Sequence, residues 1–253
     1  SPALSRKRME MSSPEKAEHL GSMPMGRLLA RIAIPGSVAL IVNSTYNLVD
    51  TIFVGRGVGP LGIGAVTLLF PFRIIVMSFG NLVGIGGASV VSRALGAGNA
   101  EKATRAAGTA LTIAAAIGLL VGIAGWVLAP ALVRLLGGAG ELYRPTYEYT
   151  RIIVLSEPFL VFNFSANFLI RSEGRARVAM FVVVSGMIVN IILDPIFIFV
   201  LEWGVGGAAL ATLFGHMLTT VLTLMWLIRG RGAVRLSLIH MRPRWGVLKE
   251  SLA

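Results

Sequence analysis

Hydrophobic residues make up 55% of this chain of 253 residues and charged residues only 14%, and the mean hydropathy is +0.78. These values lie outside the range of ordinary soluble domains and predict a membrane protein. The 23 Lys and Arg against 12 Asp and Glu give a net charge of +11, which is compatible with a nucleic-acid partner. The positions of the basic residues must decide whether such a partner is needed. The absence of cysteine excludes a disulfide framework, a thiolate nucleophile and a cysteine-based metal site.

Six segments are long and apolar enough to cross a bilayer, which requires about 20 apolar residues per helix. They are predicted at 28–53, 62–90, 106–136, 147–170, 177–201 and 205–228. The joins carry glycine-rich sequences typical of turns, at 55–60, 95–99, 136–140, 172–177 and 203–207. Asn99 is predicted to cap a short surface stretch that leads into the third span. We find no signal-peptide pattern near the first residue, so the first span is expected to direct insertion.

Basic residues gather in alternate joins of this predicted bundle. One set precedes the first span, lies between spans two and three and between spans four and five, and follows span six: Arg6, Lys7, Arg8, Lys16, Arg27, Arg31, Arg93, Lys102, Arg105, Arg171, Arg175, Arg177, Arg229, Arg231, Arg235, Arg242, Arg244 and Lys249. The opposite joins hold only Arg56, Arg134, Arg144 and Arg151. Lys and Arg collect in short cytoplasmic loops. The pattern therefore predicts a multi-pass plasma-membrane protein with cytoplasmic basic segments at 1–27 and 229–253, and it makes a nucleic-acid partner unnecessary.

The two aspartates of the chain, Asp50 and Asp194, both stand in apolar surroundings. Counted from Ala33 and Ala179 at about 1.5 Å per residue, they lie about 26 Å and 22 Å along their helices, which is a similar depth. A carboxylate inside a membrane is costly unless it faces a polar interior, and such residues usually mark ion or proton pathways. The alternative for Asp50 is a loop position just beyond the helix end.

The residues around Asp194 favour a cation site. Asn190 precedes Asp194 by four residues and so shares its helix face. Pro195 has no N–H to donate to the Ile191 carbonyl, and it must bend the helix or free that acceptor. Thr212 and Asn43 are predicted to line the same cavity. Hard oxygen ligands suit Na⁺ at Asp50, Asn190 and Asp194, but two neighbouring buried carboxyls can equally carry a proton.

Other polar and small residues inside the spans have open roles. Glu157 is either a further protonatable group or the partner of an arginine such as Arg73, and His216 is predicted to be a packed polar residue. The G-L-L-V-G sequence at 118–122 predicts close packing of two helices. Prolines inside the spans are candidate hinges, or are merely structural: Pro35, Pro71, Pro158 and Pro195.

Three motifs together resemble the amino-terminal half of the multidrug and toxin extrusion (MATE) family: Y-N-L-V-D-T-I-F-V-G-R-G-V-G at 46–59, G-I-G-G-A-S-V-V-S-R-A-L-G-A-G-N-A-E-K-A at 84–103 and N-I-I-L-D-P-I-F-I-F at 190–199. The resemblance implies an all-α membrane protein, with 28–228 forming one six-helix lobe of a cation-coupled drug antiporter. It implies a cation site made of Asp50, Asn190, Asp194 and Thr212, with Tyr149 in its hydrogen-bond network and a bend at Pro35 that reports protonation.

Two features depart from that family. Glu157 is not a residue expected at the ion site, and the family has twelve spans where this chain has six. The basic tail at 229–253 resembles the linker between lobes, so the expected partner is a missing second lobe, or a parallel homodimer if the chain is complete. We expect small organic, often cationic, substrates, contact with membrane lipid, no enzymatic activity and no cofactor beyond H⁺ or Na⁺.

Three other functions are alternatives to drug export. A flippase for lipid-linked saccharides shares the general plan but tends to line its cleft with arginines, whereas Arg73 is nearly alone within the spans here. An intramembrane aspartyl protease needs two membrane aspartates, but its Y-D and G-x-G-D motifs are missing around Asp50 and Asp194. A non-transporting half-transporter stays an alternative.

Overall fold

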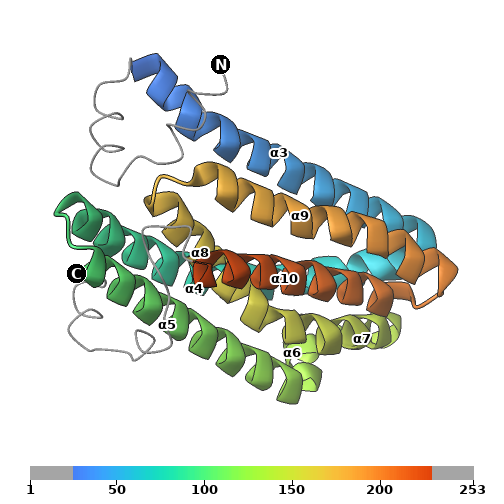
Figure 1. Cartoon of the computed structure of the whole chain (residues 1–253). Coiled ribbons are helices and arrows are strands. Elements are labelled where there is room, and N and C mark those ends of the chain that lie inside the picture. Colours follow the sequence, from blue (N-terminus) through green and yellow to red (C-terminus); the bar gives the residue numbers. More distant parts are fainter. Residues whose placement is uncertain (1–24, 230–253) are drawn as a thin grey trace.

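The computed structural model describes residues 25–229, except for the side chains of several residues up to 43, and over this range every regular element is a helix. The long helices run along one another in a bundle (Figure 1). In chain order the elements are α3 (Met25–Gly57), α4 (Pro60–Gly96), α5 (Ala100–Val127), α6 (Ala129–Leu135), the 3₁₀ turn η1 (Gly140–Leu142), α7 (Tyr143–Ile153), the 3₁₀ turn η2 (Val154–Ser156), α8 (Glu157–Ser172), α9 (Ala176–Pro195), the π-helical turn η3 (Ile196–Val200) and α10 (Gly204–Ile228).

Five stretches are long and apolar enough to cross a membrane, by length and composition: Pro60–Gly96, Ala100–Val127, Gly140–Ser172, Ala176–Val200 and Gly204–Ile228. They correspond to the second to sixth predicted spans. The first predicted span corresponds to α3, which is 33 residues long but is not among the five. The multi-pass membrane character is therefore confirmed, whereas the count of six spans stays a prediction.

The predicted boundaries were wrong where proline or a polar helix end sets the geometry. The third span was predicted as one helix over 106–136, but α5 ends at Val127 and α6 begins at Ala129, because Pro130 in the first turn of α6 has no N–H to donate. The helix also begins at Ala100, directly after Asn99, whose side chain accepts a hydrogen bond from the Lys102 N–H at 2.9 Å. The predicted N-cap is thus confirmed, but no separate surface stretch precedes the span.

The join predicted at 203–207 lies at the start of α10, which begins at Gly204, one residue before the predicted sixth span. The turn itself lies between η3 and α10, and it includes Glu202 with a positive φ of 54°. The other four glycine-rich joins fall at or beside helix ends as predicted.

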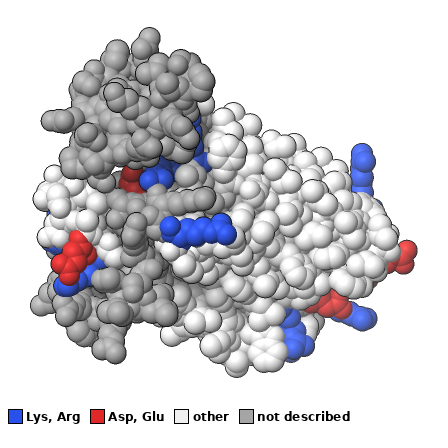
Figure 2. Space-filling view, viewed as in Figure 1, with Lys and Arg blue, Asp and Glu red and all other residues white. Residues whose placement is uncertain are grey.

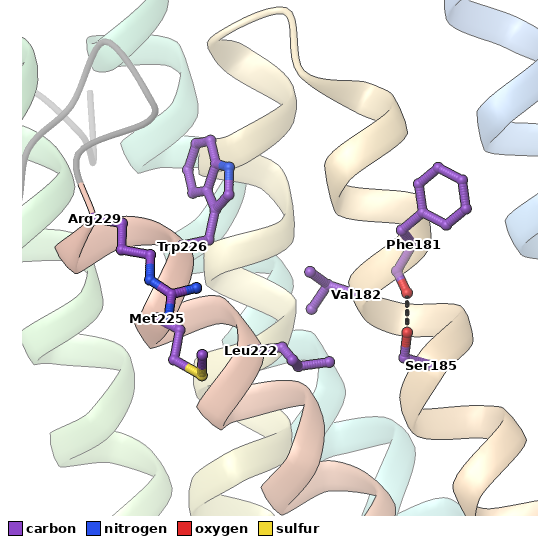
Figure 3. Close-up of a pocket in the computed structure, with 7 residues that line it drawn as sticks. All are labelled: Phe181, Val182, Ser185, Leu222, Met225, Trp226 and Arg229. Atoms are coloured by element: carbon purple, nitrogen blue, oxygen red, sulfur yellow. Dashed lines mark hydrogen bonds between the residues drawn. The ribbon is translucent and has the colours of Figure 1, made fainter.

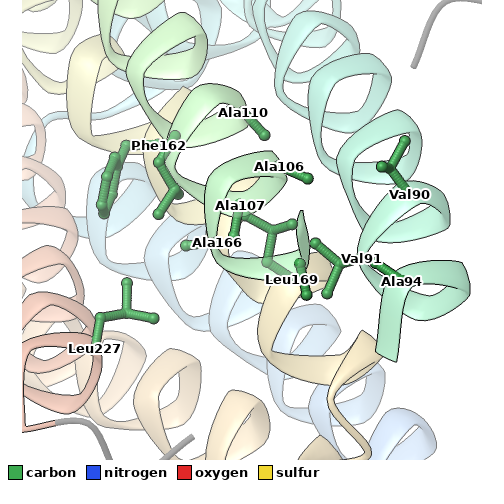
Figure 4. Packing of buried hydrophobic residues seen from close by; sticks show 12 residues of the cluster. Val90, Val91, Ala94, Ala106, Ala107, Ala110, Phe162, Ala166, Leu169 and Leu227 are labelled. Carbon is green, nitrogen blue, oxygen red and sulfur yellow. The ribbon is translucent and has the colours of Figure 1, made fainter. Parts of the chain in front are cut away.

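Small residues let the helices approach closely in the interior. One buried cluster combines alanines and valines from α4 and α5 with Phe162, Ala166 and Leu169 of α8 and Leu227 of α10 (Figure 4). Large apolar side chains are instead exposed on the outside, for example Leu120 at 69% and Ile41 at 65%. This arrangement is expected of helices that face lipid outside and one another inside.

The predicted small-residue face at 118–122 is confirmed as the contact between α5 and α8. A Cβ added to Gly118 would lie 2.7 Å from Pro158 Cα and 3.0 Å from its carbonyl oxygen, which is backbone that cannot move aside. We expect Gly118→Ala to destabilise the bundle by about 1–3 kcal/mol through overpacking. Thermal unfolding in detergent should show a lower midpoint.

The control for that prediction is Gly96→Ala, because a Cβ at Gly96 meets no atom within 4 Å. This variant should unfold at the parental temperature. An unchanged midpoint for Gly118→Ala would contradict the close contact between α5 and α8.

The two groups of joins lie at opposite ends of the bundle. The 97–99 and 173–175 joins and the end of α10 lie at one end, and the 58–59, 136–142 and 201–203 joins lie at the other (Figure 1). On the face shown in Figure 2 the charged side chains lie toward these ends, and the surface between them is almost uncharged. Arginines stack on aromatic rings at both ends, Arg175 over Trp226 at 5.6 Å and Arg151 over Trp126 at 5.2 Å. Such aromatic residues are typical of the two membrane interfaces.

Candidate functional site

Asp50 and Asp194 meet inside the bundle. Helices α3 and α9 pack side by side and run in the same direction, so residues near their carboxyl ends lie at the same level (Figure 1). Asp194 is fully buried and Asp50 is partly buried. The two carboxyl groups lie close enough to interact electrostatically. The sequence prediction that both aspartates lie at a similar level, on helices rather than in a loop, is therefore confirmed.

Asn190 and Thr212 complete the polar cluster on the side of α10. Asn190 lies one turn before Asp194 on α9, and its Nδ2 donates a hydrogen bond to Thr212 Oγ1 at 3.3 Å. Their exposed fractions are only 2% and 3%. Close contact of α9 with α10 makes this bond possible, because the two helices cross at Gly186 and Gly215, where neither has a side chain. The four residues predicted to bind the cation thus lie together.

The oxygens of this cluster are short of hydrogen-bond donors. Asp50 Oδ1, both carboxylate oxygens of Asp194 and Asn190 Oδ1 are buried and have no hydrogen-bond partner among the described residues. Leaving a buried carboxylate unpaired is costly, and the cost disappears when a proton or a metal cation binds. The donor set, two carboxylates, an amide oxygen and a hydroxyl, contains only hard oxygen ligands. The arrangement therefore suits H⁺ or Na⁺ and leaves the choice between them open.

The backbone beside Asp194 is irregular, as Pro195 predicts. Regular α-helix ends at Pro195, and a π-helical turn follows over Ile196–Val200, in which the Leu201 N–H donates to the Ile196 carbonyl at 2.9 Å. Such turns occur at functional sites. The hinge role of Pro195 itself stays a prediction. Pro35 and Asn43 lie on α3, and their side chains are outside the described residues.

Two tyrosines and an arginine surround the aspartates. Tyr149 of α7 is 3% exposed and interacts electrostatically with Arg73, Asp50 and Glu157. Its place in the hydrogen-bond network of the cation site stays a prediction. Tyr46 was missed by the sequence analysis, although it lies one helical turn before Asp50 on the same face of α3. It interacts with Asp50 and Thr212.

Glu157 pairs with Arg73, which is one of its two predicted roles. Arg73 Nε lies 3.8 Å from Glu157 Oε1, and the Glu157 side chain is fully buried at the start of α8. His216 is partly buried on α10, as predicted for a packed polar residue, and its Nδ1 has no hydrogen-bond partner among the described residues.

A pocket of about 270 Å³ lies elsewhere, between α9 and α10 near the end of α10 (Figure 3). Its walls are mainly apolar and include Phe181, Leu222 and Trp226, and Arg229 closes one side. This volume is small for a drug-sized ligand, which usually occupies roughly 300–1,000 Å³. None of the predicted cation ligands lines it, so it is not part of the aspartate cluster.

The family model MatE matches residues 35–196, which is more than half of the chain. Multidrug export protein MepA of Staphylococcus haemolyticus is 26% identical over 224 residues, covering 88% of this chain and 50% of the relative. The Staphylococcus aureus protein of the same name is 25% identical over 236 residues, covering 93% and 52%. The chain thus spans about half the length of the curated relatives it matches.

Solved structures lead to the same family. A multidrug resistance MATE transporter of the MOP superfamily, in an outward-facing conformation, superposes with a TM-score of 0.82 at 34% identity, covering 88% of this chain and 50% of that one. A MOP superfamily transporter from Pyrococcus furiosus, described as having a binding pocket of reversed polarity that suggests a different function, gives the same values. The chain belongs to the MatE family, that of the multidrug and toxin extrusion transporters which its three motifs resemble.

Proposed function

We propose that this chain forms one lobe of a cation-coupled antiporter that exports drugs or other organic, often cationic, compounds. The observation that carries the proposal is the pair Asp50 and Asp194, in which Asp50 Oδ1 and both oxygens of Asp194 are buried and lack donors among the described residues. The match to two proteins named for multidrug export supports the substrate class. Asp50, Asn190, Asp194 and Thr212 bind H⁺ or Na⁺ in this proposal.

Coupling follows from the cost of the two buried negative charges. A cation that enters the cluster from outside reduces this negative charge, and the helices can then pack around the site in a different way. A ligand shifts a conformational equilibrium only by its difference in affinity between the two states. The cation therefore has to bind one state better, and the organic substrate the other. The π-helical turn after Pro195 gives α9 a place to bend between them.

The proposed transporter needs a second wall opposite this lobe. The chain covers about half of each relative, and the proposed partner is a second six-helix lobe, or a second copy of the chain arranged in parallel. Cross-linking in native membranes should join the lobe to that partner. Drug efflux by a chain that is found only as a monomer would contradict this arrangement.

We propose that both termini of the lobe lie in the cytoplasm, since the strongly basic joins share one end of the bundle. A cysteine at the exposed position Glu141 should then react with a membrane-impermeant maleimide added outside cells. A cysteine at the exposed position Ala97, at the other end, should react only after the membrane is opened. The chain has no native cysteine to interfere. Labelling of Ala97→Cys from outside would contradict the proposed topology.

The function is tested with a two-lobe protein that contains this chain, reconstituted in liposomes. A H⁺ gradient and a Na⁺ gradient are imposed in separate experiments. One of the two should drive a fluorescent organic cation against its own concentration gradient. A protein that binds the dye but moves it under neither gradient would contradict coupled export.

The flippase alternative is tested in the same liposomes with a labelled lipid-linked saccharide. Such a function needs arginines that are free to bind phosphate groups, whereas Arg73 is paired with Glu157. We therefore expect no gradient-dependent flipping.

A further inference from the structure

The guanidinium of Arg73 interacts with carboxyl groups on two different helices. Glu157 of α8 is its ion-pair partner, with Nε and Oε1 3.8 Å apart. Arg73 also interacts electrostatically with Asp50 of α3, which in turn interacts with Asp194 of α9. One fixed cation thus connects the residue that departs from the family pattern to the aspartate cluster.

The pair of Arg73 and Glu157 is incomplete as a structural salt bridge. A strong arginine–carboxylate pair is bidentate, with N–H···O distances of about 2.7–2.9 Å. Here both oxygens of the fully buried Glu157 and the Nε of Arg73 lack a hydrogen-bond partner among the described residues. An ion pair without its full set of hydrogen bonds is weak evidence for stability. The pair of Arg73 and Glu157 therefore indicates a role other than holding α4 to α8.

Asp50 and Glu157 both interact with the positive charge of Arg73. Within 25–229, the groups that interact with it, besides these two carboxyls, are Tyr149 of α7, Tyr46 of α3 and His216 of α10. Helix α5 approaches the Glu157 carbonyl through Gly118, which brings no charge. The two tyrosines and the histidine therefore offer polar atoms, whereas the charges near the guanidinium are carboxylates.

We propose that Arg73 is a built-in cation that competes with the coupling ion for Asp50, and that Glu157 limits this competition by holding the guanidinium toward α8. The proposal rests on the proposed cation site at Asp50 and Asp194. In the empty site Arg73 partly balances the two aspartates. When the coupling ion binds, Glu157 retains the guanidinium. Glu157 and Arg73 are thus positioning residues that set how tightly the lobe binds its ion.

Two variants are expected to shift the cation affinity in opposite directions. Glu157→Gln keeps the shape of the side chain but frees Arg73 to approach Asp50, so half-saturation should need about ten times more cation. Arg73→Gln combined with Glu157→Gln removes both charges together. The internal competitor is then gone, and half-saturation should need about ten times less cation. Glu148→Gln, at an exposed ion pair with Arg144 on α7, is the matched control and should match the parent.

The measurement is the thermal unfolding midpoint of the purified chain, titrated with Na⁺ against choline at constant ionic strength, and separately with acid in the absence of Na⁺. An ion that binds only the folded chain raises this midpoint with concentration. If Glu157→Gln alone does not fold, the charge-neutral double variant still decides, because a merely structural pair gives no gain in cation affinity.

The possible outcomes distinguish a failure of this inference from a failure of the proposed function on which it rests. A parent that responds to neither ion overturns the proposed cation site and this inference with it. A parent that responds, while the two variants shift together or stay at the parental value, overturns this inference alone. Opposite shifts in the expected directions support it.

Discussion

Replacing either Asp50 or Asp194 with asparagine is expected to reduce cation-driven efflux to the level of liposomes without protein. Asparagine keeps the size and the hydrogen-bonding capacity of the side chain but fixes its charge at zero, as in the protonated form. The cluster then cannot change charge when the coupling ion arrives, and the ion loses its difference in affinity between the two states. Efflux of a fluorescent organic cation by the two-lobe protein, at matched expression, measures the effect.

The same variants should insert and fold normally, because a buried amide costs less than a buried carboxylate. Glu157→Gln should lose less activity, since Glu157 acts on the site through Arg73, and Glu148→Gln at the surface should lose none. If Asp50→Asn and Asp194→Asn both transport at the parental rate under the same gradient, the two aspartates have a structural role and the coupling account is wrong.

The second large effect is expected from Gly186→Val, where α9 crosses α10 one turn before Asn190. A Cβ at Gly186 would collide with Thr219 Oγ1 and lie 2.7 Å from the Gly215 carbonyl oxygen. The helices must then separate, at a cost of about 1–3 kcal/mol for overpacking. The hydrogen bond from Asn190 to Thr212 should be lost with their contact. We expect both a lower unfolding midpoint and a weaker response to the coupling ion.

Ile188→Ala, two residues along α9, is the matched control, because Ile188 is 49% exposed on the outer surface. Its free energy of unfolding should stay within about 0.5 kcal/mol of the parental value, as is usual for surface positions. A Gly186→Val chain with the parental midpoint and the parental ion response would show that the crossing of α9 and α10 does not position the site.

The sequence predicted the parts of this molecule that depend on local pattern. Apolar runs longer than 20 residues predicted the membrane helices, and an aspartate inside such a run was enough to make Asp194 a candidate site residue. Asn190 followed from its spacing of four residues, and Pro195 predicted a local irregularity that the structure places as a π-helical turn. The similar depth of the two aspartates connected Asp194 with Asp50, and Thr212 was predicted to line the same cavity.

The parts that could not be predicted depend on how helices rotate against one another. Arg73 and Glu157 are 84 positions apart, so the sequence named Arg73 as a candidate partner of Glu157 but could not decide between pairing and a separate protonatable group. Tyr46 was within reach, because one helical turn separates it from Asp50, but its direction is set by packing of α3 on α9 and α10. The early start of α5 was missed because its first turn is polar, and a helix does not end where the apolar core of the bilayer does.

The most direct test of the central claim is the infrared difference spectrum of the purified chain, recorded when the coupling ion is added. We predict carboxyl and carboxylate stretching bands that change with the ion in the parent and in Glu148→Gln, and that vanish when Asp50 and Asp194 are both asparagine. Bands of the same size in that double variant would mean that the ion binds elsewhere, and would contradict the account of the two buried aspartates.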